Sequence, residues 1–323
     1  MGVFLFENDY HYLYFEWLQS HYMEKIMISA RSLNYLTKKP SLLSLGMLFV
    51  LSFTQLGCTS QTPKPAQQLD PQLTQAGKII DLDSGKSITP QQLIQELAAS
   101  PRVIVGEKHD NIYHHQIEQW VAQEMQQIRP QGAVLLEMLT PDQQSRVNNV
   151  QKQMQGNPYI RDEKLQEILH WNSGWPWAQY GELVKYLLAQ PSPVLAANIN
   201  RDAVLKAYDN PPTITGTHST QPVIQELISE TIKRSHNGEL DDKQAKKMLV
   251  IQQLRDRAMA QGLLDAPAPA LLFAGGYHAT RAIGVPLHML DLAPDEPLKV
   301  LIISEQGEEI DNLHADYVWY TPK

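Results

Sequence analysis

Short apolar runs alternate with longer amphipathic stretches from residue 77 onwards, and this alternation predicts strands joined by helices. Such runs, bounded by turn residues, are typical of buried strands. The expected strands cover residues 78–82, 102–105, 133–136, 194–197, 268–273, 299–304 and 316–320. Strands that alternate with helices favour an α/β fold with a largely parallel sheet and helices on both faces.

Between these strands the apolar residues return at helical spacing. Thr89, Pro90 and Gln92 predict a helix start, with Thr89 as N-cap in a capping box. We expect another helix to end near Ile128, with Asp110 as its N-cap. Further helices are expected from Thr140, over 181–190, and over 222–236 and 241–263, and the fold is expected to include a helical insertion.

The N-terminal part of the chain reads as an export segment rather than as part of the fold. Basic residues precede an apolar run over 42–56, which ends at Gly57 and Cys58 and is too short for a typical membrane span. A small residue followed by Cys58, the only cysteine, resembles the lipobox of bacterial lipoproteins. A signal anchor with an incidental cysteine is the alternative.

These features divide the chain into four parts. We expect residues 1–26 to be a mis-called start, 27–57 a lipoprotein signal peptide, 58–76 a flexible tether, and 77–323 the α/β domain. The predicted location is the cell envelope, lipid-anchored at Cys58, facing the periplasm from the outer membrane. The net charge of −8 gives no reason to expect nucleic acid as a partner.

Ligand-type side chains follow four of the predicted strands. In open α/β sheets, residues beyond the carboxyl ends of the strands converge on one edge, where ligands bind. Two of these ends share the pattern Gly-x-x-His, and paired histidines with carboxylates suit a divalent metal or iron. Histidines bonded inside a core are the alternative. The strand-end residues are Glu107, His109, Glu137, Asn198 and His278.

Two further groups of residues lie near these strand ends in the sequence. His114 and His115 occupy the first turns of the helix that follows Glu107, where a surface position and a pocket position are both open. The tryptophans at 171, 175 and 177, with Tyr180, form either an aromatic wall for a flat ligand or ordinary packing.

Taken in order, these motifs resemble ChaN, the haem-binding uptake family of the Tiki superfamily. The resemblance covers about residues 77–295. The matching residues are Gly106, Glu107, His109, Asp110, Asn111, His114, His115, Leu136, Glu137, Met138, Gly174, Trp175, Pro176, Tyr180, Gln252, Asp256, Met259, Ala260, Gly275, His278, Gly284, Val285 and Pro286.

The resemblance implies haem binding at the envelope, in haem and iron uptake, without enzymatic activity. It further implies haem held between two protomers, with a tyrosine on the iron and a histidine of the partner near the propionates. A tyrosinate ligand suits ferric iron. The resemblance leaves the tyrosine open among Tyr113, Tyr159, Tyr180 and Tyr277. The implied haem pocket comprises Glu107, His109, His114, His115, Glu137, Tyr180, Tyr277 and His278.

Two other functions remain open at this stage. The first is a metal-dependent hydrolase, an esterase or peptidase, in which His109 and His278 hold a divalent metal and Glu107 or Glu137 acts as general base. The second is a structural or interaction protein that kept the fold and lost the site. A serine hydrolase is disfavoured, because the chain contains no Gly-x-Ser-x-Gly elbow.

Overall fold

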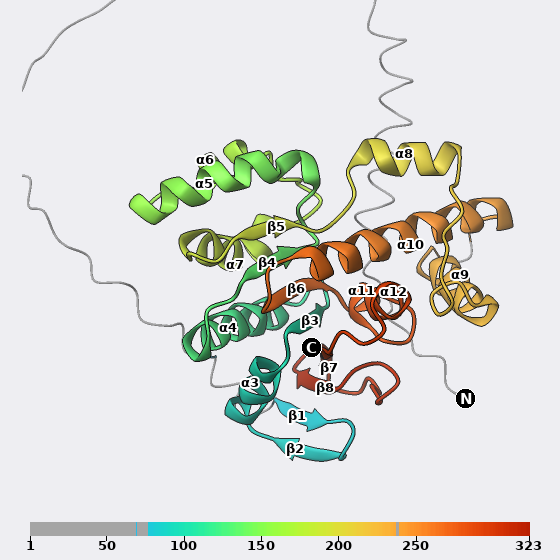
Figure 1. Ribbon diagram of the computed structural model, residues 1–323, viewed down its shortest axis with the longest axis horizontal. Coiled ribbons are helices and arrows are strands. Elements are labelled where there is room, and N and C mark those ends of the chain that lie inside the picture. Colours follow the sequence, from blue (N-terminus) through green and yellow to red (C-terminus); the bar gives the residue numbers. More distant parts are fainter. Residues whose placement is uncertain (1–68, 70–76, 237–238) are drawn as a thin grey trace, which may run out of the picture.

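The computed structural model describes residue 69 and residues 77–236 and 239–323, which form one mixed sheet covered by helices (Figure 1). The export segment, Cys58 and most of the predicted tether lie outside the described residues. The strands are β1 (Lys78–Asp81), β2 (Lys86–Ile88), β3 (Arg102–Glu107), β4 (Ala133–Leu136), β5 (Val194–Ala196), β6 (Ala270–Gly275), β7 (Leu298–Glu305) and β8 (Tyr317–Thr321).

The sheet has the strand order β2-β1-β8-β7-β3-β6-β4-β5. The strands from β8 to β5 in this order run parallel to their neighbours, whereas β1 is antiparallel to both β8 and β2. The prediction of a largely parallel α/β sheet is therefore confirmed. The short strand β2 was not expected, because residues 86–88 carry no apolar run.

Helices cover both faces of this sheet. The helices are α3 (Pro90–Ala99), α4 (Ile112–Ile128), η1 (Pro141–Gln143), α5 (Gln144–Gly156), α6 (Asp162–Leu169), α7 (Trp177–Ala189), α8 (Arg201–Asp209), α9 (Pro222–Ser235), α10 (Asp242–Asp265), α11 (Gly276–Ala279) and α12 (Val285–Leu292). Alternate residues of the strands divide between two apolar cores. In β3, Val103 and Val105 face α3 to α7, and Ile104 faces α10 to α12.

Several predicted helix ends are confirmed by their caps. Thr89 caps α3 in a capping box with Gln92, and Asp241 caps α10 in the same way with Gln244. The expectation that Asp110 caps α4 was wrong. The N-cap is Asn111, whose side chain accepts from the backbone N–H of Tyr113 at 3.0 Å, because the chain makes one more turn after β3 before the helix begins.

The helical insertion is formed by α8, α9 and the adjoining part of α10, which extend away from the sheet (Figure 1). It has two small apolar cores of its own: α8 packs on α10 around Val204 and Ile251, and α9 packs on α10 around Ile228 and Met248. The sequence predicted α9 and α10 but neither α8 nor α6, since each is short and carries few apolar positions.

Candidate functional site

The carboxyl ends of β3, β6 and β4 lie side by side, because these strands are parallel neighbours. Glu107 is the last residue of β3, Glu137 follows β4, and His278 lies in α11 directly after β6. From β3 the chain continues through α4 to β4, while from β6 it continues through α11 and α12 on the other face to β7. The two connections thus leave β3 and β6 on opposite faces of the sheet, and open α/β sheets bind ligands beyond the carboxyl ends of their strands.

Glycine residues allow α11 and its neighbours to approach the strand ends closely. A Cβ on Gly106 would lie 2.5 Å from Ala279 Cβ and 2.6 Å from Ile302 Cδ1, so α11 packs directly against the backbone of β3. A Cβ on Gly284 would lie 2.2 Å from the carbonyl oxygen of His278. The glycine of the Gly-x-x-His pattern at residues 106–109 thus allows the end of β3 to pack closely against α11, which follows β6.

One half of the site centres on Glu107. Its Oε1 lies 2.5 Å from His109 Nδ1 and accepts from the Tyr180 hydroxyl at 3.1 Å, and that hydroxyl lies 3.0 Å from His109 Nδ1. Burial raises the pKa of Glu107, but the charge of His109 and its hydrogen bond outweigh burial and lower it. Glu107 Oε2 is buried and has no hydrogen-bond partner among the described residues.

His115 extends this half along α4. Its Nδ1 lies 2.9 Å from Glu118 Oε2, and its Nε2 lies 3.1 Å from the carbonyl oxygen of His109. Burial, reinforced by the charge of Glu107, raises the pKa of Glu118 to about 7. The sequence analysis missed Glu118, although its place one turn after His115 on α4 is a detectable signal.

The other half centres on His278. Its Nδ1 lies 2.6 Å from Asp256 Oδ1 and its Nε2 lies 3.2 Å from Glu137 Oε1. Burial alone lowers the pKa of His278, but the two carboxylates outweigh burial and raise it to about 10. Glu137 Oε2 also accepts from the backbone N–H of Gly275 at 2.8 Å. Burial opposes ionisation of Glu137, yet His278 lowers its pKa to about 2.

The two halves form one buried cluster of interacting charges, since His109 lowers the pKa of Glu137 and Glu137 raises that of Glu107. Asp256 and Gln252 complete it from α10, with Gln252 Nε2 2.9 Å from His278 Nδ1. The sequence singled out these two residues only within the family resemblance.

The remaining predicted site residues lie apart from this network. His114 is a structural residue: its Nδ1 accepts from the backbone N–H of Lys108 at 2.9 Å and its Nε2 lies 3.0 Å from Thr321 Oγ1. Burial lowers its pKa to about 3, so the ring is neutral. Asn198, after β5, accepts from the neighbouring backbone N–H of Ile199 at 2.8 Å.

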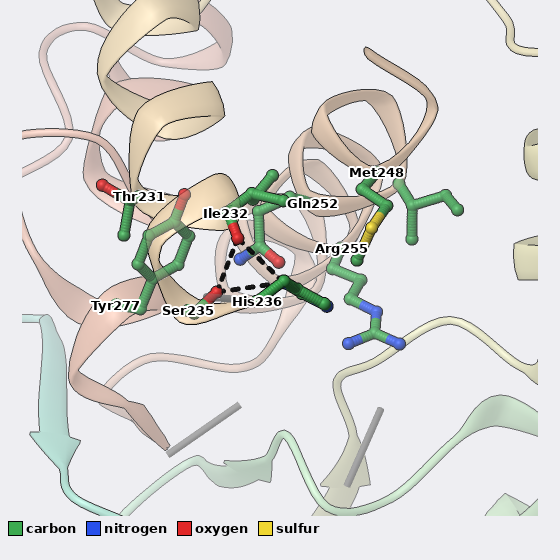
Figure 2. A pocket seen from close by; sticks show the side chains of 9 residues that line it. Thr231, Ile232, Ser235, His236, Met248, Gln252, Arg255 and Tyr277 are labelled. Carbon is green, nitrogen blue, oxygen red and sulfur yellow. Dashed lines mark hydrogen bonds between the residues drawn. The ribbon is translucent and has the colours of Figure 1, made fainter. Parts of the chain in front are cut away.

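Tyr277 faces a cavity of about 40 Å³ between α9, α10 and α11 (Figure 2). Gln252 and His236 line the same cavity. His236 Nδ1 lies 3.2 Å from Ser235 Oγ and 2.8 Å from the carbonyl oxygen of Ile232. Burial raises the pKa of Tyr277 well above its ordinary value, as it does for Tyr180.

The donor set does not fit a metal ion. Both nitrogens of His278 face carboxylates, and a cationic imidazole has no lone pair for a metal. Within residues 77–236 and 239–323, no group of three or more histidine, cysteine, aspartate or glutamate side chains is arranged to hold one. The arrangement is instead suited to holding and moving protons.

Comparison with known proteins identifies the family of this chain. The model of the haem-binding uptake family of the Tiki superfamily, ChaN, matches residues 93–289. The chain belongs to the ChaN family. No curated protein matches it significantly.

Among solved structures, ChaN of Campylobacter jejuni, described as binding haem cofacially, is 29% identical with a TM-score of 0.69. The match covers 75% of this chain and 96% of that one. A mutant erythromycin esterase in its open conformation is 11% identical, with a TM-score of 0.42, covering 67% of this chain and 73% of that one. So distant a match carries no argument about function.

Proposed function

We propose that this ChaN-family protein binds haem at the cell envelope and takes part in haem and iron uptake, without enzymatic activity. The observation that carries the proposal is the family match over residues 93–289, supported by the likeness to the haem-bound ChaN of Campylobacter jejuni over 96% of that chain. Bound haem would supply a ferric iron that accepts an anionic oxygen ligand such as tyrosinate.

A haem-ligating tyrosine must present its hydroxyl to the ligand. Tyr180 and Tyr277 are 0% and 5% exposed, and burial raises the pKa of both phenols, which opposes the phenolate form. Of the other tyrosines weighed from the sequence, Tyr159 is 69% exposed and Tyr113 is half-buried. Tyr208 on α8 is also half-buried, and the sequence analysis did not consider it.

The helical insertion fits haem best because it combines three features. On α8, Leu205 is 40% exposed and lies one turn before Tyr208, which gives an apolar surface beside a phenol. Lys247 Nζ lies 4.2 Å from the centroid of the Tyr208 ring, a cation–π contact that positions the ring. A groove of about 580 Å³ between α9 and α10 has Lys246 in its lining, and lysines attract carboxylates such as propionates. Lys233 lines the same groove and is paired with Asp242.

The groove has the size of small-molecule sites, which span roughly 300–1,000 Å³. We therefore propose Tyr208 as the iron ligand, with the insertion as the haem-facing surface. A second copy of the chain could close over an exposed haem face, so the proposal includes a homodimer around haem.

Anchoring through lipid on Cys58 in the outer membrane belongs to the same proposal. It is supported by the apolar run before Cys58 and by the polar stretch after it. Within the part of the chain that the structure describes, no helix is both long and apolar enough to cross a membrane. The alternative of a metal-dependent hydrolase has no support from the donor geometry, since His278 is held by two carboxylates.

Titration with haemin tests the proposal. We expect saturable binding with a tyrosinate charge-transfer band in the wild type, and loss of that band in Tyr208→Phe. Tyr186→Phe, which removes another half-buried phenol from α7, is the matched control and should bind as the wild type does. Non-saturable binding by the wild type would refute haem binding itself, whereas a band that persists in Tyr208→Phe but disappears in Tyr159→Phe or Tyr113→Phe would refute only the ligand assignment.

A further inference from the structure

Tyr180 is a buried phenol whose hydroxyl contacts both a carboxylate and an imidazole. Its side chain is completely buried, yet the hydroxyl lies 3.1 Å from Glu107 Oε1 and 3.0 Å from His109 Nδ1. A phenylalanine would fill the same apolar space without a polar atom to satisfy. The hydroxyl therefore serves the polar network rather than the packing.

The ring of Tyr180 is in turn surrounded by aromatic side chains. The centroid of Trp175 lies 5.5 Å away at an interplanar angle of 84°, and that of Trp171 lies 6.4 Å away. Trp171 continues to Trp177 at 5.1 Å, and the Trp171 indole N–H donates to the carbonyl oxygen of Trp175 at 2.7 Å. All three tryptophans are half-buried, so the aromatic cluster reaches from the buried network to the surface.

The tryptophans are closely packed against their surroundings. Trp177 packs against the backbone of α7 at Gly181, where a Cβ would lie 2.6 Å from the indole nitrogen. Trp175 also packs edge-on against His109, with centroids 4.8 Å apart. Fixed spacing matters because electron transfer between aromatic rings falls steeply with distance and is favourable near van der Waals contact.

We propose that Tyr180 is a redox-active tyrosine, with Glu107 as its proton acceptor and Trp171 and Trp175 as its electron path to the surface. A one-electron oxidant takes an electron from Tyr180 while the phenolic proton moves to Glu107 Oε1. The products are a neutral tyrosyl radical, a neutral Glu107 carboxyl and the reduced oxidant. A surface reductant returns the electron through the tryptophans, and the proton returns to the phenolate oxygen.

The oxidant belongs to the class of strong one-electron oxidants, which haem and peroxide generate together. The electron and proton steps belong to this chain's own residues and do not depend on where haem binds.

Flash photolysis of the full chain with tris(bipyridine)ruthenium and persulfate tests the proposal, since photogenerated ruthenium(III) is the oxidant. Freeze-quenched samples are examined by electron paramagnetic resonance. We expect a long-lived neutral tyrosyl radical in the wild type and at least a five-fold lower yield in Tyr180→Phe. Tyr186→Phe is the matched control on the same helix and should give the wild-type yield. Circular dichroism verifies that each variant is folded.

Two further variants test the path and the proton step. Trp171→Phe combined with Trp175→Phe should slow formation of the Tyr180 radical several-fold while leaving its spectrum unchanged. Radical formation in the wild type should also slow in D₂O, because the proton moves with the electron. The proposal is overturned if the tyrosyl signal keeps its yield and spectrum in Tyr180→Phe, or if the double tryptophan variant forms the radical at the wild-type rate.

Discussion

His278 Nδ1 lies 2.6 Å from Asp256 Oδ1, a contact that joins α11 to the middle of α10 inside the protein. Glu137 lies on the other nitrogen of the same ring at 3.2 Å. Two carboxylates thus hold one imidazolium at the strand ends, and all three side chains are at most 2% exposed. Buried charges persist only when they are paired in this way, which makes the triad sensitive to any change in charge.

The first prediction concerns pH. Burial lowers the pKa of His278, but the two neighbouring carboxylates outweigh burial and raise this pKa to about 10. The folded state therefore holds the His278 proton more tightly than the unfolded state does. The stabilisation is complete below the unfolded value of about 6.5 and is lost as pH rises through about 10. We expect the urea midpoint to fall over this range, and nitrogen-detected NMR to show His278 still protonated at about pH 8.5. A ring that deprotonates near its ordinary pKa would contradict the geometry.

The second prediction concerns Glu137. Replacing it in Glu137→Gln removes one charge beside the buried His278 cation, and breaking a buried ion pair costs about 3–5 kcal/mol. Chemical denaturation should report this loss. The control is Glu167→Gln, which removes the exposed Lys164–Glu167 pair and should leave the denaturation midpoint unchanged, because water screens that pair. Equal effects of the two substitutions would show that the buried pair is not special.

The third prediction concerns the glycine of the first Gly-x-x-His pattern. Gly106→Ala places a Cβ 2.5 Å from Ala279 Cβ, so β3 and α11 must separate, at a cost of about 1–3 kcal/mol. Gly156→Ala is the control, since a Cβ there meets nothing within 4 Å. Thermal melting compares the two. A Gly106→Ala variant as stable as the control would mean that the strand ends are not tightly packed.

The fourth prediction rests on the proposed haem site. Lys247→Met removes the cation that lies 4.2 Å from the centroid of the Tyr208 ring, so the cation–π contact that positions the ring is lost and haemin should bind more weakly. Lys243→Met, an exposed position on α10, should bind as the wild type does. Wild-type affinity in Lys247→Met would show that this contact does not position the haem ligand.

The sequence by itself determined the order and type of most elements. The apolar runs predicted seven of the strands within a few residues, because buried strands need unbroken apolar side chains whatever they pack against. It also indicated that Glu107, Glu137 and His278 come together, because the carboxyl ends of parallel strands share an edge. Where local apolar spacing was weak, as in α8 and β2, the pattern gave no signal.

Only the tertiary structure decided what each of these side chains does. His109 and His114 follow the same strand, yet His109 contacts Glu107 whereas His114 contacts the backbone of Lys108 and the hydroxyl of Thr321. No local pattern distinguishes them, because their partners come from segments far away in the chain. Burial of Tyr180 and exposure of Leu205 beside Tyr208 arise in the same way, since the packing of whole helices decides which side chains reach the surface.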